Sequence, residues 1–599
     1  MFNSTEINFL DVKLSWTDYI LFGTLLSMSV LIGGWFGLVR KQTTTTEYNF
    51  GGKTMNYFPV SVSILTCHLS GIALVGVPAE IYQYGTHYLA TIVSVILTGL
   101  VTVYICLPVF YHLQQPSVFG YLQLRFSRST RLIYSFFYII TLFIYVPIVI
   151  YVPSLGLAQV TKISIHVIAP VLSIICIIYT SLARLKAVVW TDTLQFTIVV
   201  VSIVAIFTIG VKTVGGFAEI FRATDQGERL IFLDLNPSPF VRNSFFATTL
   251  GMTLHFFAVM SVNQGAIQKL LSVPTQKNAA VATLIMSIME IFMKILFVFI
   301  GLIIYTRYRN CDPVSTKIVD RSDQIFPFFV MEVTGHIPGL AGLFLTGLGS
   351  AALSTMSTNL NVISGIVYED FIEPWMPNNA AKDKKGTKIM KLLVVIAGFI
   401  SIGLVFMVDG LGTVFQISIS LRSVIDGPMV GIFFLGLMVP WVKARGALIG
   451  TFVSFVFMLW YVSSSEYYKL KFKTFSDTLP ISVEQCPYPL NNTVIHSSPS
   501  PSKIEENSIP LIYQISFLYY TAIGFIVMCV VAISASFILK ETDIDNVNPE
   551  HFTPFVKRYI SRKKVYREVP SKEVDRVGIN LKETVQLDLK VPKMSATER

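Results

Sequence analysis

Hydroxyl and amide side chains recur at regular spacing within an apolar stretch of the chain, GSAALSTMSTNLNVISG at residues 349–365. Steps of four, three, four and three residues place them on one face of an α-helix. They are Ser350, Ser354, Ser357, Asn361 and Ser364. A polar face within an apolar helix either lines a path for an ion or solute, or lets membrane helices pack closely and hydrogen-bond to one another. Both interpretations fit the spacing.

The helices that position this stripe are expected to cross a membrane. The 599 residues are 53% hydrophobic and only 14% charged, more apolar surface than a soluble protein of this size would bury. Apolar runs of ~20 residues, the length that crosses a hydrocarbon core of ~30 Å, recur along the chain. We therefore predict an all-α polytopic membrane protein with about 13 transmembrane helices.

The expected spans lie near residues 17–39, 54–81, 87–111, 131–158, 163–182, 187–211, 244–268, 279–305, 337–368, 389–408, 412–438, 444–463 and 510–538. Outside the spans, the chain has an N-terminal segment at 1–16, a long loop at 464–509 and a tail at 540–599.

The net charge of +10 indicates topology rather than a nucleic-acid partner, because the basic residues are spread over short loops and the tail. With the N-terminus outside, the loops expected in the cytoplasm contain most of them, including Lys186, Lys269 and Lys277. An odd number of spans then places the tail in the cytoplasm. The glycosylation sequons at Asn3 and Asn491 fall outside the cell in this arrangement.

The six cysteines form no CxxC pair and no cluster with histidine at metal-ligand spacing, so we expect neither zinc nor redox chemistry. Cys311 and Cys486 both fall in expected outside loops, where oxidising conditions permit a disulfide. The cytoplasmic segments contain no nucleotide-binding loop and no arrangement of nucleophile and base. We therefore expect neither an enzyme nor an organic cofactor.

A helix break is expected in SVSILTCHLSGIALVGVPAE at residues 61–80. Ser70-Gly71, Gly76 and Pro78 weaken the helix there, and polar side chains cluster just before them. A broken membrane helix exposes backbone carbonyls that can bind a cation within a cavity. The alternative is a gentle kink with ordinary packing.

Several stretches, in this order, resemble the sodium/solute symporter family, and within it the branch of sodium-coupled monocarboxylate, multivitamin and iodide transporters. They are PVFYHLQQPSVFGYLQLRFSR at 108–128, LKAVVWTDTLQ at 185–195, NPSPFVRNSFF at 236–246, VNQGAIQKLLS at 262–272, and SAALSTMSTNLN followed by YEDF within 350–371. The resemblance extends from about residue 15 to 540. It implies a LeuT-type fold with two inverted five-helix repeats, here assigned to residues 54–211 and 244–463.

The same resemblance implies a sodium site, with Na⁺ as the co-transported ion. Its ligands map to the backbone carbonyls of Thr66, Leu69 and Ala351 and the hydroxyls of Ser354 and Thr355. Neutral oxygen ligands suit sodium, because they bind this hard cation weakly enough to release it. Asp192 matches an acidic residue beside this site and would add negative charge behind the ligands. Its alternative role is an ion pair with Lys186 or Arg184.

Solute contacts implied by the resemblance map to Cys67, His68, Ser70, Phe256, Gln264 and Arg422. Relatives carry an uncharged residue at the position of Arg422, so this side chain favours an anionic solute. Asp426 lies one helical turn further on, however, and an ion pair between the two is the structural alternative. Glu290 and Lys294 have the same spacing.

Together these observations predict a plasma-membrane symporter that uses sodium to import a small organic anion, such as a monocarboxylate or a carboxylate vitamin, by alternating access. An inorganic anion or an uncharged solute is the nearest alternative. A sensor that kept the fold without transporting is another, but the complete set of sodium ligands argues against it.

Overall fold

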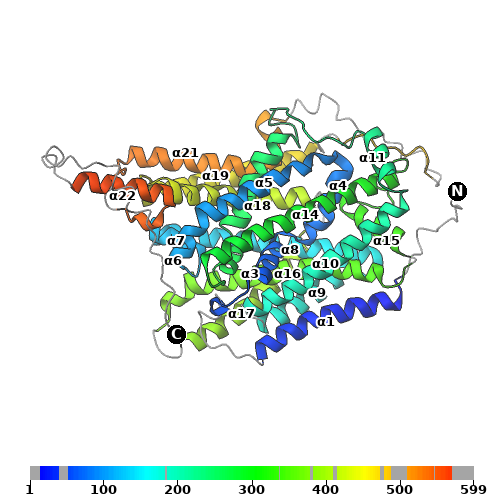
Figure 1. Cartoon of the computed structure of the whole chain (residues 1–599), viewed down its shortest axis with the longest axis horizontal. Helices are drawn as coiled ribbons and strands as arrows, with labels where there is room; N and C mark the ends of the chain where they lie inside the picture. The colour runs from blue at the N-terminus through cyan, green and yellow to red at the C-terminus, as the bar shows by residue number, and fades with distance from the viewer. Residues whose placement is uncertain are drawn as a thin grey trace, which may run out of the picture.

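The computed structural model describes residues 14–38, 51–182, 185–335, 337–377, 382–408, 414–472, 478–486, 509–544 and 547–568. Every regular element in these residues is helical. Figure 1 shows long helices running side by side, with α1 and α21 at opposite edges of the bundle and α16 between them.

The α-helices are α1 (Trp16–Leu38), α3 (Tyr57–His68), α4 (Gly71–Tyr84), α5 (Thr91–Val101), α6 (Leu107–Leu113), α7 (Val118–Arg125), α8 (Arg128–Thr161), α9 (Ile165–Leu182), α10 (Leu185–Thr213), α11 (Phe217–Gln226), α12 (Met252–Phe256), α13 (Gln264–Leu270), α14 (Gln276–Tyr308), α15 (Ile325–Thr334), α16 (Leu340–Ile366), α17 (Lys382–Val405), α18 (Val414–Met438), α19 (Ala444–Phe472), α21 (Tyr520–Ile538) and α22 (Pro554–Glu568). Single π-helical turns flank α12, at Ala247–Gly251 and Phe257–Ser261.

Eleven helices in the described residues are long and apolar enough to cross a membrane, and the bent pair α3–α4 makes twelve. The chain is therefore a multi-pass membrane protein. The expected count of thirteen is not confirmed, because the segment predicted at 244–268 contains only a shorter apolar helix, Ala247–Ser261. Its π-helical turns and the end of the helix at Val262 interrupt what the sequence presents as one continuous apolar run.

The predicted break in the second span is confirmed. Helices α3 and α4 meet at an angle of 61°, with Leu69 and Ser70 between them. Pro78 lies inside α4 and does not end it. Gly76 serves close packing, since a Cβ atom there would lie 2.9 Å from the Cβ of Phe415 on α18.

The stripe-bearing helix α16 is central. In its most apolar stretch 89% of the residues are buried, against 22% for α1 at the periphery. Helices α8, α10 and α3 contact α16. The serines of the stripe are all buried. The polar stripe therefore faces other helices rather than lipid.

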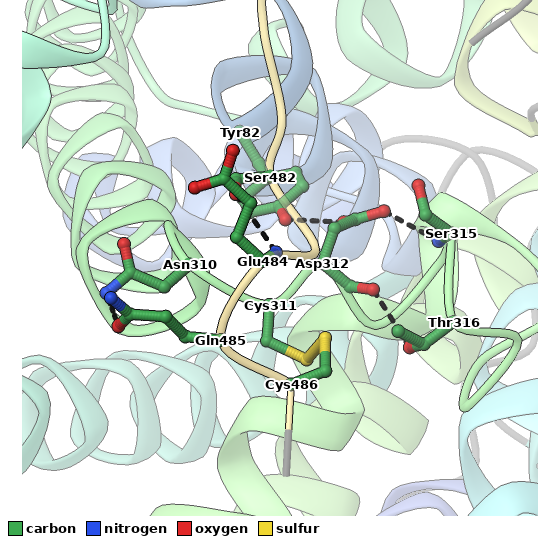
Figure 2. Close-up of a disulfide and its surroundings, with 10 residues drawn as sticks. All are labelled: Tyr82, Asn310, Cys311, Asp312, Ser315, Thr316, Ser482, Glu484, Gln485 and Cys486. Atoms are coloured by element: carbon green, nitrogen blue, oxygen red, sulfur yellow. Dashed lines mark hydrogen bonds between the residues drawn. A yellow bond between two sulfur atoms is a disulfide. The ribbon is translucent and has the colours of Figure 1, made fainter. Parts of the chain in front are cut away.

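A disulfide joins Cys311, just after α14, to Cys486, with an S–S distance of 2.11 Å (Figure 2). Residues 478–486, here called the disulfide segment, also bond to neighbouring backbone: the Asp312 amide donates to the Ser482 carbonyl at 3.0 Å, and the Leu479 amide to the Gln83 carbonyl at 2.9 Å. The Tyr82 hydroxyl donates to Asp312 at 2.5 Å. The disulfide segment thus covers the ends of α4 and α14, which we call the disulfide end of the molecule.

Candidate functional site

The break between α3 and α4 faces α16 at the hydroxyl pair predicted to bind a cation. The Thr355 hydroxyl lies 3.1 Å from the Thr66 carbonyl oxygen and 3.0 Å from that of Ala351, within hydrogen-bond distance of both. All three residues are buried. Three of the five predicted ligands therefore meet at one point. A cation there would replace the hydrogen bonds that now join them.

Ser354, the neighbouring predicted ligand, is oriented by Asp192. Its hydroxyl donates to Asp192 Oδ1 at 2.5 Å, while the Ser63 hydroxyl donates to Oδ2 at 2.5 Å. Because the Ser354 proton points at the carboxylate, the lone pairs of its oxygen remain available to a cation. Asp192 thus lies directly behind the predicted ligand Ser354.

Asp192 forms an ion pair with a residue that the sequence did not indicate. Lys269 places its ammonium 3.0 Å from Asp192 Oδ2. Arg184 lies outside the described residues, and Lys186 forms no ion pair among those that the structure describes. Lys269 was expected in a cytoplasmic loop, but it lies on α13 with 1% of its surface exposed. No local sequence signal distinguishes it from a topogenic lysine.

A cavity of about 100 Å³ adjoins the break. Leu69, the remaining predicted cation ligand, lines it together with His68 and Ser70 from the same break. The other histidine, serine and charged residues that line it come from three further helices and are His255 from α12, Glu290 and Lys294 from α14, and Ser418 and Arg422 from α18. The cation site and the cavity therefore share the broken helix.

Arg422 forms the ion pair considered from the sequence and also lines the cavity. Its Nε donates to Asp426 Oδ2 at 3.3 Å, which forms the i,i+4 ion pair, and its guanidinium lies 4.7 Å from the centre of the Tyr145 ring. The same side chain lines the cavity. His255 Nδ1 lies 3.6 Å from Asp426 Oδ2.

Glu290 and Lys294 also line the cavity. From the sequence they were considered only as an ion pair within one helix. Their charged atoms lie 3.8 Å apart, and the ammonium sits 4.5 Å from the centre of the Phe256 ring. Buried polar atoms without a hydrogen-bond partner in the structure include His68 Nε2, His255 Nδ1 and Glu290 Oε2. Because buried polar atoms are normally satisfied, this group fits a cavity that receives a polar solute or water.

Two predicted solute contacts lie elsewhere. Gln264 accepts from the Val118 amide at 2.6 Å and donates to the Pro116 carbonyl at 3.0 Å, so its side chain joins two segments of backbone and does not line the cavity. Cys67 also stays outside the cavity lining, and its sulfur lies 3.0 Å from the Lys269 ammonium. Asn3 and Asn491, the predicted glycosylation sites, lie outside the described residues.

A model of the Sodium:solute symporter family matches residues 48–454. Sodium-coupled monocarboxylate transporter 2 of Mus musculus is 32% identical over 553 residues, covering 92% of this chain and 88% of that protein. A putative sodium-dependent multivitamin transporter of Drosophila melanogaster is 31% identical, with 85% of this chain and 84% of that protein covered.

Among solved structures, a Na⁺-coupled sialic acid symporter in a substrate-bound outward-open state superposes with a TM-score of 0.71 at 22% identity, covering 88% of this chain and 98% of that one. Mhp1, a nucleobase-cation-symport-1 family transporter, gives 0.51 at 10% identity. The fold is therefore the LeuT type predicted from the sequence. The boundaries assigned to its two repeats remain a prediction.

Proposed function

Because this chain belongs to the sodium:solute symporter family, we propose that it imports a small organic anion, such as a monocarboxylate or a carboxylate vitamin, across the plasma membrane. Sodium-coupled solute transport follows from the family itself. The chemical class of the solute is the part that rests on the site.

The proposed sodium site consists of the carbonyls of Thr66, Leu69 and Ala351 and the hydroxyls of Ser354 and Thr355. Its ligands are neutral, and the nearby carboxylate of Asp192 is balanced by Lys269. Sodium therefore meets no uncompensated negative charge, which favours binding weak enough for release in each transport cycle.

Arg422 is the observation that supports an anionic solute. A guanidinium has five N–H donors, and the ion pair with Asp426 engages Nε. Arg422 lines the cavity while Asp426 does not, so the guanidinium rather than the carboxylate meets the solute. Charge-assisted hydrogen bonds to such a group orient a carboxylate strongly.

The charges around the cavity lead to the same class of solute. The positive charge of Lys294 is paired with Glu290 and that of Arg422 with Asp426, so the net charge of these four side chains is zero. A sodium ion bound beside the cavity adds one positive charge. A monovalent anion would neutralise it, and this mutual attraction couples the two binding events.

The disulfide end is the outside in this proposal, since disulfides persist in oxidising surroundings. Sodium would bind from that side, stabilise the outward-open state and favour solute binding before the cavity opens to the cytoplasm. The N-terminus would then lie outside and the tail inside the cell.

The test is uptake and current in cells that express the chain, across lactate, butyrate, pantothenate, iodide and glucose, with sodium or choline outside. Sodium-dependent uptake of the carboxylates alone supports the proposal. Uptake of iodide or glucose in their place assigns one of the alternative solute classes, and binding without uptake assigns a sensor. Arg422→Lys is the matched variant, because it keeps the charge but loses the planar donor geometry.

A further inference from the structure

Lys269 makes an unusual number of polar contacts for a buried side chain. Its Nζ lies 2.9 Å from the Ser63 carbonyl oxygen, 3.0 Å from Asp192 Oδ2, 3.0 Å from Cys67 Sγ and 3.2 Å from Thr358 Oγ1. These partners belong to α3, α10 and α16, while Lys269 itself lies on α13. One ammonium therefore joins four helices beside the proposed sodium site.

Asp192 lies between this ammonium and the proposed sodium ligands. Its Oδ2 faces Lys269, and its Oδ1 accepts from the hydroxyl of Ser354. On the other side, the Ser63 carbonyl that accepts from Lys269 also accepts from the Thr66 hydroxyl at 2.9 Å. The ammonium is thus separated from two predicted sodium ligands by one intervening residue each.

We propose that Lys269 is a fixed counter-cation of the sodium site, which lowers sodium affinity by occupying the carboxylate of Asp192 and repelling the bound ion. This inference rests on the proposed placement of sodium at Thr66, Ala351, Ser354 and Thr355. Two like charges in a buried region repel much more strongly than in water. Lys269 thereby promotes the release of sodium after each cycle.

Lys269 also lines a second, smaller cavity, which offers sodium a route out of its site. Its volume is about 30 Å³, and Lys269, Gln268, Thr358, Asn361 and Gly365 are among the residues that line it. Helix α13 precedes the start of α14, whereas the disulfide follows its end, so this cavity lies away from the disulfide end. Asn361 belongs to the polar stripe, which therefore continues from the sodium site past Lys269 into this cavity.

The alternative is that the Lys269–Asp192 ion pair only stabilises the fold. Measuring sodium affinity distinguishes this structural role from the proposed one. The experiment measures binding of radioactive sodium to the purified full-length protein, together with maximal sodium-driven uptake of lactate or whichever other carboxylate of the uptake panel is transported. Lys269→Met removes the charge with little change in length. We expect sodium affinity to rise roughly tenfold, as for loss of a nearby unit charge, while maximal uptake falls because release becomes slow.

Two controls accompany this variant. Lys269→Arg keeps the charge, so its sodium affinity should stay near that of the unmodified protein. Lys277→Met removes an exposed lysine at the start of α14 and should change neither quantity. Unchanged or weaker sodium binding by folded Lys269→Met protein would overturn the inference.

Lys269→Met leaves Asp192 without its cation and can fail to fold. In that case Asp192→Asn is compared with the double variant Asp192→Asn, Lys269→Met, in which no carboxylate is left unpaired. Tighter sodium binding by the double variant supports repulsion by the ammonium, and equal binding overturns it. Ser354→Ala tests the proposed position of sodium separately. If this variant binds sodium as well as the unmodified protein does, the proposed sodium site is wrong, whatever the effect of Lys269.

Discussion

Arg242 donates two parallel hydrogen bonds of 2.9 Å each to the carboxylate of Glu80. Glu80 lies on α4, three residues after the cavity residue Val77. A third hydrogen bond, of 2.8 Å, joins Arg242 to Gln416 on α18, next to the cavity residue Phe415. This cluster therefore connects α4, α18 and the segment before α12 on the disulfide side of the cavity.

Breaking the Glu80–Arg242 pair should destabilise the protein. Glu80→Gln leaves a mostly buried guanidinium without its counter-charge, a change that costs about 3–5 kcal/mol. Thermal unfolding of the purified protein should show a lower midpoint, and surface expression should fall. Adding Arg242→Gln should restore part of both. Glu541→Gln, which breaks the exposed pair with Arg445, serves as the control and should change little.

Removing one hydroxyl from the proposed sodium site should affect sodium more than solute. Ser354→Ala or Thr355→Ala deletes an oxygen ligand with little change in volume, so we expect the half-saturating sodium concentration to rise about tenfold, equal to about 1.4 kcal/mol. Thr355→Ser keeps the hydroxyl and should behave nearly as the unmodified protein does. Uptake measured against sodium concentration checks this, and equal uptake in choline would contradict it.

Arg422→Gln should raise the Michaelis constant for the anion about tenfold or more, through loss of a charge-assisted hydrogen bond. Sodium affinity and surface level should change little if the guanidinium serves the solute. A structural role predicts retention of the protein in the cell instead, because the buried Asp426 would lose its guanidinium partner. The double variant Arg422→Gln, Asp426→Asn removes both charges. Normal anion uptake by that variant would exclude a solute role for Arg422.

Loss of the disulfide should lower stability without altering the sodium site. The disulfide joins residues that are 175 positions apart, and Cys311→Ser removes this cross-link. Loss of a native disulfide typically lowers the free energy of unfolding by about 2–5 kcal/mol. Cys486→Ser should have the same effect, and the double variant should be no worse than either single one. Thermal unfolding checks this, with sodium affinity as the internal control. Additive losses would show that the two residues act separately.

The membrane orientation makes a further prediction. A tag placed after Arg599 should be reached by antibody only in permeabilised cells, and Asn491→Gln should remove glycan detectable by a gel shift. Antibody binding to the tag on intact cells would reverse the proposed orientation.

Local chemistry along the chain determined much of this protein. Apolar runs long enough to cross a bilayer indicated the membrane class. Weak helix formers at Ser70-Gly71 marked the break, and the spacing of Ser350, Ser354 and Ser357 gave one face of α16. These features depend on near neighbours in sequence. Sequence analysis therefore described them without knowing how the helices pack.

Tertiary structure decided which charges meet. Asp192 and Lys269 are 77 residues apart, and a lysine near the end of a short helix looks the same in sequence whether it faces the cytoplasm or a buried carboxylate. Gln264, predicted as a solute contact, bonds to backbone outside the cavity, whereas Lys294, considered from the sequence only as one half of an ion pair, also lines the cavity. Helix periodicity fixes which residues share a face, but only the packing of distant helices determines what that face meets.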